Sequence, residues 1–276
     1  MQTDLIHIKG KLYHFDELWI MAILNLSEDS FFEHFSGKSD NSLLTHVENL
    51  ISNGAKIIDI GSVSTRPNAP KVPSKEEINK LGSSISTIKK KFPSVLISID
   101  SIAEETHSFA INEGADIIND ISGGEISESI ISSIVKNKLA YILTYNRGRK
   151  ENLVKNESTE NILSDSLLFF SEKLEFFAQH DLYDIVLDPG FGFNKSLEDN
   201  FNLLRYSEFL KILERPMLFG LSRKSMIYKT LEIKVEEALN GTNIFHTYAH
   251  LKGANILRVH DIVQAKQLKM LLSKLN

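Results

Sequence analysis

Eight short apolar runs divide the chain, and each of them ends abruptly at polar residues. The runs are WIMAILN (19–25), IIDIG (57–61), LISID (96–100), DIIND (116–120), YILTY (141–145), DIVLD (184–188), MLFGLS (217–222) and NILRVHD (255–261). Such a run is typical of a strand buried on both faces. A polar residue at its end is costly to bury unless that end of the strand opens into a solvent-filled cleft. Eight of these strands predict a (β/α)8 TIM barrel, an α/β fold whose active sites lie at the carboxyl ends of the strands.

Helix-length segments separate the runs, as that fold requires. They cover roughly 40–53, 75–91, 103–113, 127–137, 158–179, 198–213, 234–251 and 262–275. The 276 residues match the typical length of one barrel, so we expect a single domain over 1–276. Residues 1–16 carry alternating apolar positions around a Lys-Gly-Lys turn, which predicts an N-terminal β-hairpin that closes the lower end of the barrel.

The composition excludes several classes of protein. The chain has no cysteine, which excludes disulfides and a Cys nucleophile and fits a reducing compartment such as the cytoplasm. The N-terminus has neither a secretory signal nor a run long enough to cross a bilayer, so we expect no membrane partner. A formal net charge of -5 argues against a nucleic-acid partner.

Three segments lack helical periodicity and are rich in turn-forming or charged residues, namely 26–39, 62–74 and 146–157. They follow the first, second and fifth strands, so we expect them to be lids or substrate-binding loops. Within the second, STRP (64–67) sets Arg66 before a proline, from where its guanidinium can reach a phosphate or a carboxylate.

The segment DPGFGFNK (188–195) carries the clearest chemical pattern. Asp188 ends a strand, and Phe191 and Phe193 place aromatic surface beside its carboxylate. An ionised carboxylate accepts two parallel N–H bonds from an amidine-like edge, such as that of a pterin or a guanine. The alternative is that Asp188 caps the next helix and the phenylalanines pack in the core.

Other strand ends carry candidate binding residues. GLSRKS (220–225) places two cations after the seventh run, which suits an anionic group or simply a solvated turn. Arg258 and His260 lie two residues apart on the last strand, so they face the same side and suit one diphosphate.

Asn25 and Asp100 are the last residues of the first and third runs, and Asn119 is the last but one of the fourth. Helix capping is the commoner use of Asn and Asp, yet a barrel brings all of its strand ends around one cleft. We therefore expect these three residues in the site, and we expect Asp59 and Asp120 to be structural carboxylates.

Six segments, in this order, resemble the sequence blocks of the dihydropteroate synthase family, the pterin-binding family of the folate pathway. They are IMAILNLSEDSF, IIDIGSVSTRPN, DIINDISGG, DPGFGFNK, GLSRKS and RVHD. The resemblance covers nearly the whole chain. It implies a transferase that condenses 6-hydroxymethyl-7,8-dihydropterin diphosphate with 4-aminobenzoate, giving 7,8-dihydropteroate and diphosphate.

The resemblance also implies a role for each matching position. The pterin would be held by Asp100, Asn119, Asp188, Phe193 and Lys224. The diphosphate would be held by Asn25, Arg66, Arg258 and His260, with Asn25 acting through Mg²⁺. The aminobenzoate would be framed by Thr65, Pro67, Phe193, Lys224 and Ser225. Lys224, Asp100 and Arg66 would be the catalytic residues, sulfonamides would be inhibitors that mimic aminobenzoate, and the protein would form a homodimer.

The chain departs from the family pattern at seven places. Ser27, Glu28, Val63 and Asn68 replace the usual Thr, Pro, Glu and Gly of the first two loops, and Thr144, Tyr145 and Asn146 replace the Met-His-Met of a Met-His-Met-Arg-Gly block. We therefore keep open a pterin-binding paralogue without synthase activity, and we expect altered sulfonamide affinity. A pterin-dependent methyltransferase is a weaker alternative, because STRP and SRKS would have no evident role in it.

Overall fold

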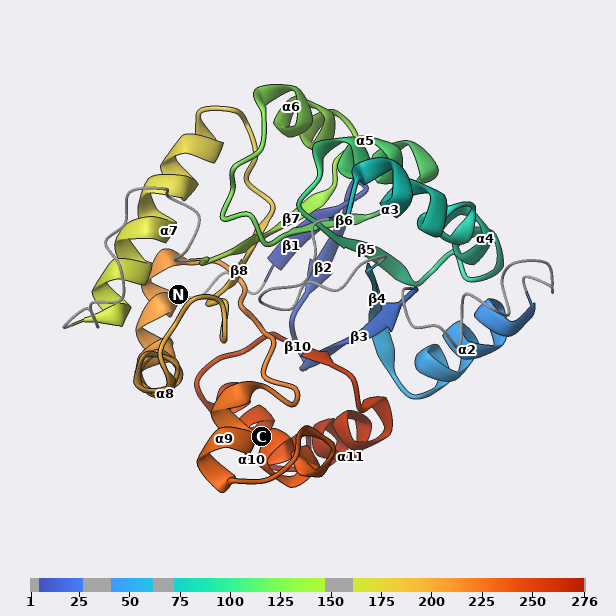
Figure 1. The fold of residues 1–276 in the computed structure, drawn as a ribbon. Coiled ribbons are helices and arrows are strands. Elements are labelled where there is room, and N and C mark those ends of the chain that lie inside the picture. Colours follow the sequence, from blue (N-terminus) through green and yellow to red (C-terminus); the bar gives the residue numbers. More distant parts are fainter. Residues whose placement is uncertain (1–4, 27–40, 62–71, 147–160, 276) are drawn as a thin grey trace.

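A parallel barrel of eight strands forms the centre of the molecule, which confirms the predicted fold class (Figure 1). The computed structural model describes residues 5–26, 41–61, 72–146 and 161–275. The strands pair in the order β8-β7-β6-β5-β4-β3-β10-β9. The two ends of this order, β8 and β9, lie together. Leu187 forms a bridge with Met217, and the Leu187 N–H donates to the Pro216 carbonyl at 2.9 Å.

Seven of the eight strands coincide with the predicted runs to within two residues at either end. The strands are β3 Trp19–Asn25, β4 Ala55–Gly61, β5 Leu96–Ser101, β6 Ile117–Asp120, β7 Ala140–Thr144, β8 Ile185–Asp188, β9 Leu218–Phe219 and β10 Ile256–Val259. The seventh run was predicted over 217–222, but β9 has only two residues. It ends early because the chain turns away after Gly220, and Arg223 adopts a left-handed conformation with φ 52°.

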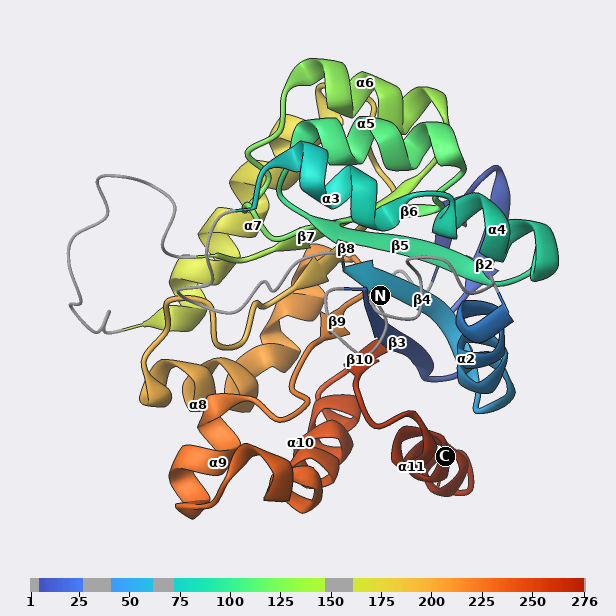
Figure 2. The same cartoon turned by 45° about the vertical axis from the view of Figure 1, so that its right-hand side comes forward.

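The helices cover the outside of the barrel, and Figure 2 shows α3 to α6 grouped on one side of it. The α-helices are α2 Asn41–Ser52, α3 Ser74–Leu81, α4 Ser84–Lys91, α5 Glu104–Glu113, α6 Glu128–Lys136, α7 Ile162–Ala178, α8 Leu197–Tyr206, α9 Ser225–Leu231, α10 Leu239–Leu251 and α11 Ile262–Leu272. Two 3₁₀ helices, η1 Ser207–Leu213 and η2 Val235–Glu237, join them.

Several helix predictions differ from the structure, and the segments 198–213 and 234–251 each divide into an α-helix and a 3₁₀ helix. The segment 75–91 was expected as one helix but forms two, because Gly82 takes φ 45° at the end of α3. The short helix α9 was not expected at all. Within the described ranges, no helix is long and apolar enough to span a membrane.

Two apolar clusters follow from the alternation of side chains along the strands. The larger one lies between the strands and the helices and includes Ile58, Ile97 and Leu187. The smaller one fills the barrel and includes Ile57 and Val186, each next in sequence to a residue of the first cluster. Residues two and four positions after a barrel-filling residue therefore lie on the same inward face of the strand. They are closer to its carboxyl end.

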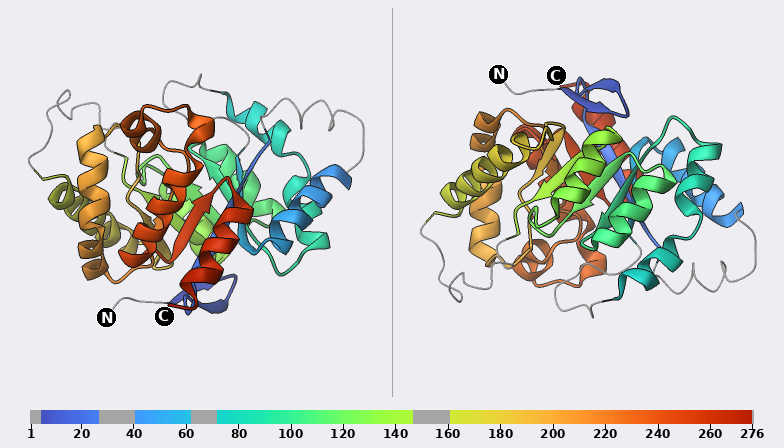
Figure 3. Two further views of the ribbon diagram at one scale, coloured as in Figure 1. Left: turned by 90° about the horizontal axis from the view of Figure 1, so that it is seen from below. Right: turned by 90° about the horizontal axis from the view of Figure 1, so that it is seen from above.

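The N-terminal hairpin consists of β1 Leu5–Ile8 and β2 Lys11–His14, paired antiparallel. Lys9 and Gly10 both have positive φ, as a two-residue hairpin turn of type I′ requires. Ile6, Ile8 and Phe15 belong to the barrel-filling cluster. Figure 3 shows the hairpin, in blue, at one end of the barrel beside α11, so the predicted closure of the lower end is confirmed.

Candidate active site

The inward-facing positions at the upper ends of the strands are polar. Asp100 follows the barrel-filling Leu96 by four residues, and Asn119 follows Ile117 by two. Asp188 follows Val186 and Arg258 follows Ile256 in the same way. Inter-strand register places Asp100 opposite Asn119, and Thr144 opposite Asp188. Polar side chains predicted from separate strand ends are thereby gathered inside one mouth.

Arg258 stands at the centre of this mouth. Its Nε donates to Asp59 Oδ2 at 2.7 Å, and its Nη2 donates to Asp100 Oδ2 at 2.5 Å. Asp59 is fully buried and also accepts a hydrogen bond from Asn119 Nδ2 at 3.2 Å. Although burial acts to lower the pKa of Arg258, the two carboxylates raise it, so the guanidinium stays charged.

Asp59 is the residue that sequence reasoning left outside the site. It was expected to be a structural carboxylate, yet it contacts both Arg258 and Asn119. The signal that could have found it is its position two residues after Ile57, which puts it on the inward face. Asp120, in contrast, accepts hydrogen bonds from the Ser122 and Tyr141 hydroxyls and holds a turn, as expected of a structural carboxylate.

Several buried oxygen atoms in the barrel have no hydrogen-bond partner within the part of the chain that the structure describes. They are Ser98 Oγ, Asp100 Oδ1, Asn119 Oδ1 and Thr144 Oγ1. Unpaired buried polar atoms are rare and costly in native proteins. A group of them on neighbouring strands is therefore typical of a site that is completed by a polar ligand.

Two of the aspartates that face the mouth, Asp100 and Asp188, have perturbed acidities. Burial raises the pKa of Asp100 to about 6, and the nearby Asp59 adds to this, while Arg258 and Lys224 oppose it. Burial also raises the pKa of Asp188, against the Gly190 N–H and the Lys224 charge. Nearby cations and, for Asp188, the Gly190 N–H act against this effect and favour the ionised carboxylates.

The DPGFGFNK loop is shaped around Asp188. Asp188 Oδ1 accepts a hydrogen bond from the Gly190 N–H at 2.8 Å. Gly190 has φ 69°, and a Cβ there would lie 2.2 Å from the Tyr145 carbonyl oxygen, so only glycine fits. Lys195 was not predicted to have a role, but its Nζ donates to the carbonyls of Tyr145, Gly190 and Phe193 and fixes the loop.

Lys224 enters the mouth from the turn after β9. Burial lowers the pKa of Lys224 to about 8, with the Arg258 charge acting in the same direction and the Asp188 and Asp100 charges opposing it. Its Nζ lies 4.8 Å from the centroid of the Phe193 ring, a cation–π distance. The neighbouring Ser225 is half-buried at the first position of α9.

His260 follows β10 at the rim of the mouth, where part of the residue is exposed to solvent. Burial of the ring, followed by the Arg258 charge, lowers the pKa of His260 to about 4. The imidazole is therefore neutral at pH 7, and Arg258 and Lys224 supply the positive charge of the mouth. Asn25 ends β3 at the same rim and is half-buried.

Part of the predicted site lies outside the described residues. Thr65, Arg66 and Pro67 belong to this part, as do the departures Ser27, Glu28, Val63 and Asn68. The departure at Tyr145 is described, and its ring packs outside the barrel, 5.1 Å from Phe169 and 6.1 Å from Phe170 between centroids. The same ring lies 4.4 Å from Lys195 Nζ, so this substitution contacts a helix of the outer layer and the lysine that fixes the DPGFGFNK loop.

Fold and mouth together define a class of protein: a TIM barrel whose strand ends hold buried carboxylates and amides for a polar ring, next to fixed cations for an anion. The chain belongs to the family described as "Pterin binding enzyme", whose model matches residues 21–260.

The relatives of the chain carry a more particular name. It is 35% identical to the dihydropteroate synthase of Bacillus subtilis (strain 168), over 100% of this chain and 95% of the relative. A solved structure of Xanthomonas albilineans dihydropteroate synthase with 4-aminobenzoic acid superposes with a TM-score of 0.87, at 26% identity over 99% and 98% of the two chains. A Yersinia pestis dihydropteroate synthase in complex with a sulfonamide drug gives 0.87, at 28% identity and 98% of each chain.

Proposed function

We propose that this chain is a dihydropteroate synthase, which joins 6-hydroxymethyl-7,8-dihydropterin diphosphate to 4-aminobenzoate. The observation that carries the proposal is the group of buried acceptors in the barrel mouth: Asp188 beside the unpaired oxygens of Asp100 and Asn119. A pterin presents an edge of N–H donors that requires such acceptors. The relatives named dihydropteroate synthase support this reaction, and a role in the folate pathway is part of the proposal.

Pterin recognition is assigned to three acceptors and two ring contacts. Asp188 would accept two N–H bonds from the amino-pyrimidine edge, and Asn119 would offer its unpaired oxygen to the same edge. Asp100 would hold a ring N–H with Oδ1, because its Oδ2 is already engaged by Arg258. Phe193 and Lys224, which contact one another, would cover the ring.

The chemical step is a displacement at the methylene carbon of the pterin. The nitrogen lone pair of aminobenzoate forms the new C–N bond, the C–O bond to diphosphate breaks with its electron pair on oxygen, and the amine loses one proton. Arg258 would stabilise the leaving diphosphate with its charge, and neutral His260 would donate one hydrogen bond. Arg66 is assigned to the same anion from the loop that lies outside the described residues.

Magnesium fits the charge balance of the mouth. Arg258 and Lys224 already lie beside the carboxyls of Asp59, Asp100 and Asp188, so a bound diphosphate would bring negative charge that Arg66 alone does not balance. In the described ranges no group of three or more His, Cys, Asp or Glu residues is placed to hold a metal. Mg²⁺ commonly keeps waters and binds through substrate phosphates with few protein ligands, and the Asn25 amide would supply one oxygen. When bound, the ion would neutralise charge on the leaving group.

The aminobenzoate is assigned to the rim beside Lys224. Ser225, at the start of α9, would lie near its carboxylate, and Phe193 would pack on its ring, with Thr65 and Pro67 completing the subsite. Sulfonamides, which are bound by a relative, would compete there. The substitutions at Val63 and Asn68 would then change sulfonamide inhibition more than turnover.

Three further features are part of the proposal. The whole of 1–276 would act as one domain, located in the cytoplasm. A homodimer would cover the apolar side chains exposed on η1, α10 and α11, which include Ile212, Leu251 and Leu271. Sedimentation at micromolar concentration tests the dimer.

The alternative is a pterin-binding paralogue that makes no pteroate. It is favoured by the position of Thr144, which faces the mouth opposite Asp188 where family members usually carry Met. Incubation of purified protein with both substrates and Mg²⁺, followed by mass spectrometry for dihydropteroate, separates the two functions. Product from the wild type that is lost in Asp188→Asn supports the synthase. Pterin binding without product supports the paralogue.

A further inference from the structure

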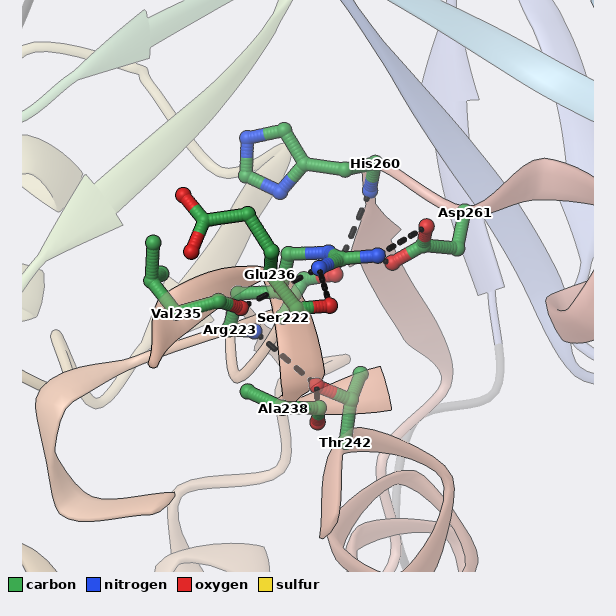
Figure 4. Close-up of polar contacts among 8 residues, drawn as sticks. All are labelled: Ser222, Arg223, Val235, Glu236, Ala238, Thr242, His260 and Asp261. Atoms are coloured by element: carbon green, nitrogen blue, oxygen red, sulfur yellow. Dashed lines mark hydrogen bonds and ion pairs between the residues drawn. The ribbon is translucent and has the colours of Figure 1, made fainter. Parts of the chain in front are cut away.

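Arg223 and Asp261 form a bidentate ion pair directly beside the proposed site. Arg223 Nε donates to Asp261 Oδ2 at 2.9 Å, and Nη2 donates to Oδ1 at 2.8 Å (Figure 4). Lys224 follows the arginine in sequence, and His260 precedes the aspartate. The pair therefore joins the two chain segments that carry a proposed pterin contact and a proposed diphosphate contact.

The Arg223 side chain is committed to protein acceptors. Its Nη1 also donates to the carbonyls of Val235 at 3.1 Å and Glu236 at 2.7 Å, so four hydrogen bonds engage the guanidinium. An arginine has five N–H donors, which leaves little capacity for a substrate. GLSRKS was interpreted either as an anion site or as a solvated turn, and Arg223 fits neither interpretation, because its guanidinium is paired with Asp261.

Asp261 is committed as well. It occupies the N-cap position of α11, where an aspartate usually accepts a hydrogen bond from the helix backbone. Its side chain makes no capping hydrogen bond, and both of its oxygens accept from Arg223.

The backbone of the turn is fixed from two further sides. The Arg223 N–H donates to Thr242 Oγ1 at 3.0 Å, and the Thr242 hydroxyl donates to the Ala238 carbonyl at 2.8 Å. The His260 N–H donates to Ser222 Oγ at 3.3 Å. The left-handed conformation of Arg223 separates its side chain from that of Lys224, and Figure 4 shows the His260 ring directed away from the pair.

We propose that the Arg223–Asp261 pair is a positioning element, which holds the Lys224 turn and the His260 strand end at a fixed separation so that the pterin and its diphosphate are bound together. The ligand identities rest on the proposed function. Arg223 acts through its neighbours and does not touch the substrate.

A purely stabilising role is the competing explanation, and the chain offers a matched control for it. Lys89 Nζ contacts both oxygens of Asp116, at 3.1 and 2.8 Å. The two pairs are similarly enclosed, with 24% and 4% of the side chains exposed in the control and 25% and 21% in the Arg223 pair. Because Asp116 directly precedes β6, the control pair lies at the opposite end of the barrel.

The test compares Arg223→Met, Arg223→Lys, Asp261→Asn and Lys89→Met in three measurements: steady-state kinetics, amide hydrogen exchange, and calorimetric binding of inorganic diphosphate with Mg²⁺. In Arg223→Met and Asp261→Asn we expect KM for the pterin diphosphate to rise by about tenfold or more. We also expect weaker diphosphate binding and faster exchange at 222–226 and 259–261. Arg223→Lys should recover little, because an ammonium cannot make the bidentate contact.

Lys89→Met should lower Tm and change none of these values. Variants of Arg223 and Asp261 that lower Tm but keep wild-type KM, diphosphate affinity and local exchange would overturn the inference. If the wild type makes no dihydropteroate, the proposed function fails, and diphosphate binding and exchange still decide the role of the pair. Asp261→Asn keeps the side-chain volume and serves if Arg223→Met does not fold.

Discussion

Asp100 and Asn119 lie opposite one another in the register of β5 and β6, and each keeps one buried oxygen without a hydrogen-bond partner in the described residues. Their other polar atoms are engaged, Asp100 Oδ2 by Arg258 and Asn119 Nδ2 by Asp59. The protein therefore holds these two acceptors ready at a cost in stability. A ligand with adjacent N–H donors would recover that cost on binding.

The acidities of Asp100 and Lys224 predict the pH dependence of pterin binding. Asp100 is ionised above its pKa of about 6, and Lys224 is protonated below its pKa of about 8. Affinity for 6-hydroxymethyl-dihydropterin, which lacks the diphosphate, should therefore be highest between these values. Calorimetry from pH 5 to 9 measures the profile.

Lys224→Arg provides the matched variant, because arginine stays charged through this range. It should move the alkaline limb to higher pH, whereas Lys252→Arg, in an ion pair with Glu208 at the end of α10, should leave the profile unchanged. An alkaline limb that stays in place in Lys224→Arg would refute the assignment.

Gly190→Ala should destabilise the protein more than a glycine substitution elsewhere. The new Cβ would meet the Tyr145 carbonyl at 2.2 Å in addition to a strained φ of 69°. Gly114 has φ 97° with nothing within 4 Å of its Cβ position, so Gly114→Ala should cost only about 1 kcal/mol. We expect about 3 kcal/mol or more for Gly190→Ala from urea unfolding. Equal losses in the two variants would contradict the close packing around Asp188.

His246 should make the protein sensitive to acid. It is 2% exposed, neither ring nitrogen has a partner among the described residues, and burial lowers its pKa to about 4. The unfolded chain takes up a proton below about pH 6.5 and the folded chain does not, so stability falls as the pH drops from 6.5 toward 4. The shift corresponds to a loss of up to about 3 kcal/mol. His246→Phe should flatten this decline in urea unfolding, whereas substitution of the exposed His14 by Gln should not.

Removal of Mg²⁺ should act on the diphosphate alone. Chelation with EDTA should raise KM for the pterin diphosphate by about tenfold or more. It should leave unchanged the affinity for 6-hydroxymethyl-dihydropterin, the alcohol that lacks the diphosphate. Asn25→Ala should reproduce the higher KM and reduce the response to EDTA. A parallel loss of affinity for the alcohol would argue against an ion shared with the diphosphate.

The barrel and much of its mouth could be predicted because strand ends are visible in the sequence. An apolar run with Asp188 or Asn119 close to its end predicts both the strand and the polar side chain at the carboxyl end of that strand. Asp59 was missed because it lies inside a run. The sequence does not show which face of the strand such a carboxylate occupies until Ile57, two residues earlier, is known to point into the barrel. Lys195 and Arg223 were missed as positioning residues because their partners are carbonyls and a carboxylate brought close only by the fold.

Binding of 6-hydroxymethyl-dihydropterin, measured by isothermal titration calorimetry, tests whether Asp188 forms the pterin site. The comparison is between the wild type, Asp188→Asn at the upper end of β8, and Asp184→Asn before its lower end, where the carboxylate accepts a hydrogen bond from the His7 N–H. We expect about 100-fold weaker binding in Asp188→Asn, because an amide donor would face a ligand donor, and unchanged binding in Asp184→Asn. Equal affinity in all three proteins would contradict a pterin site built on Asp188.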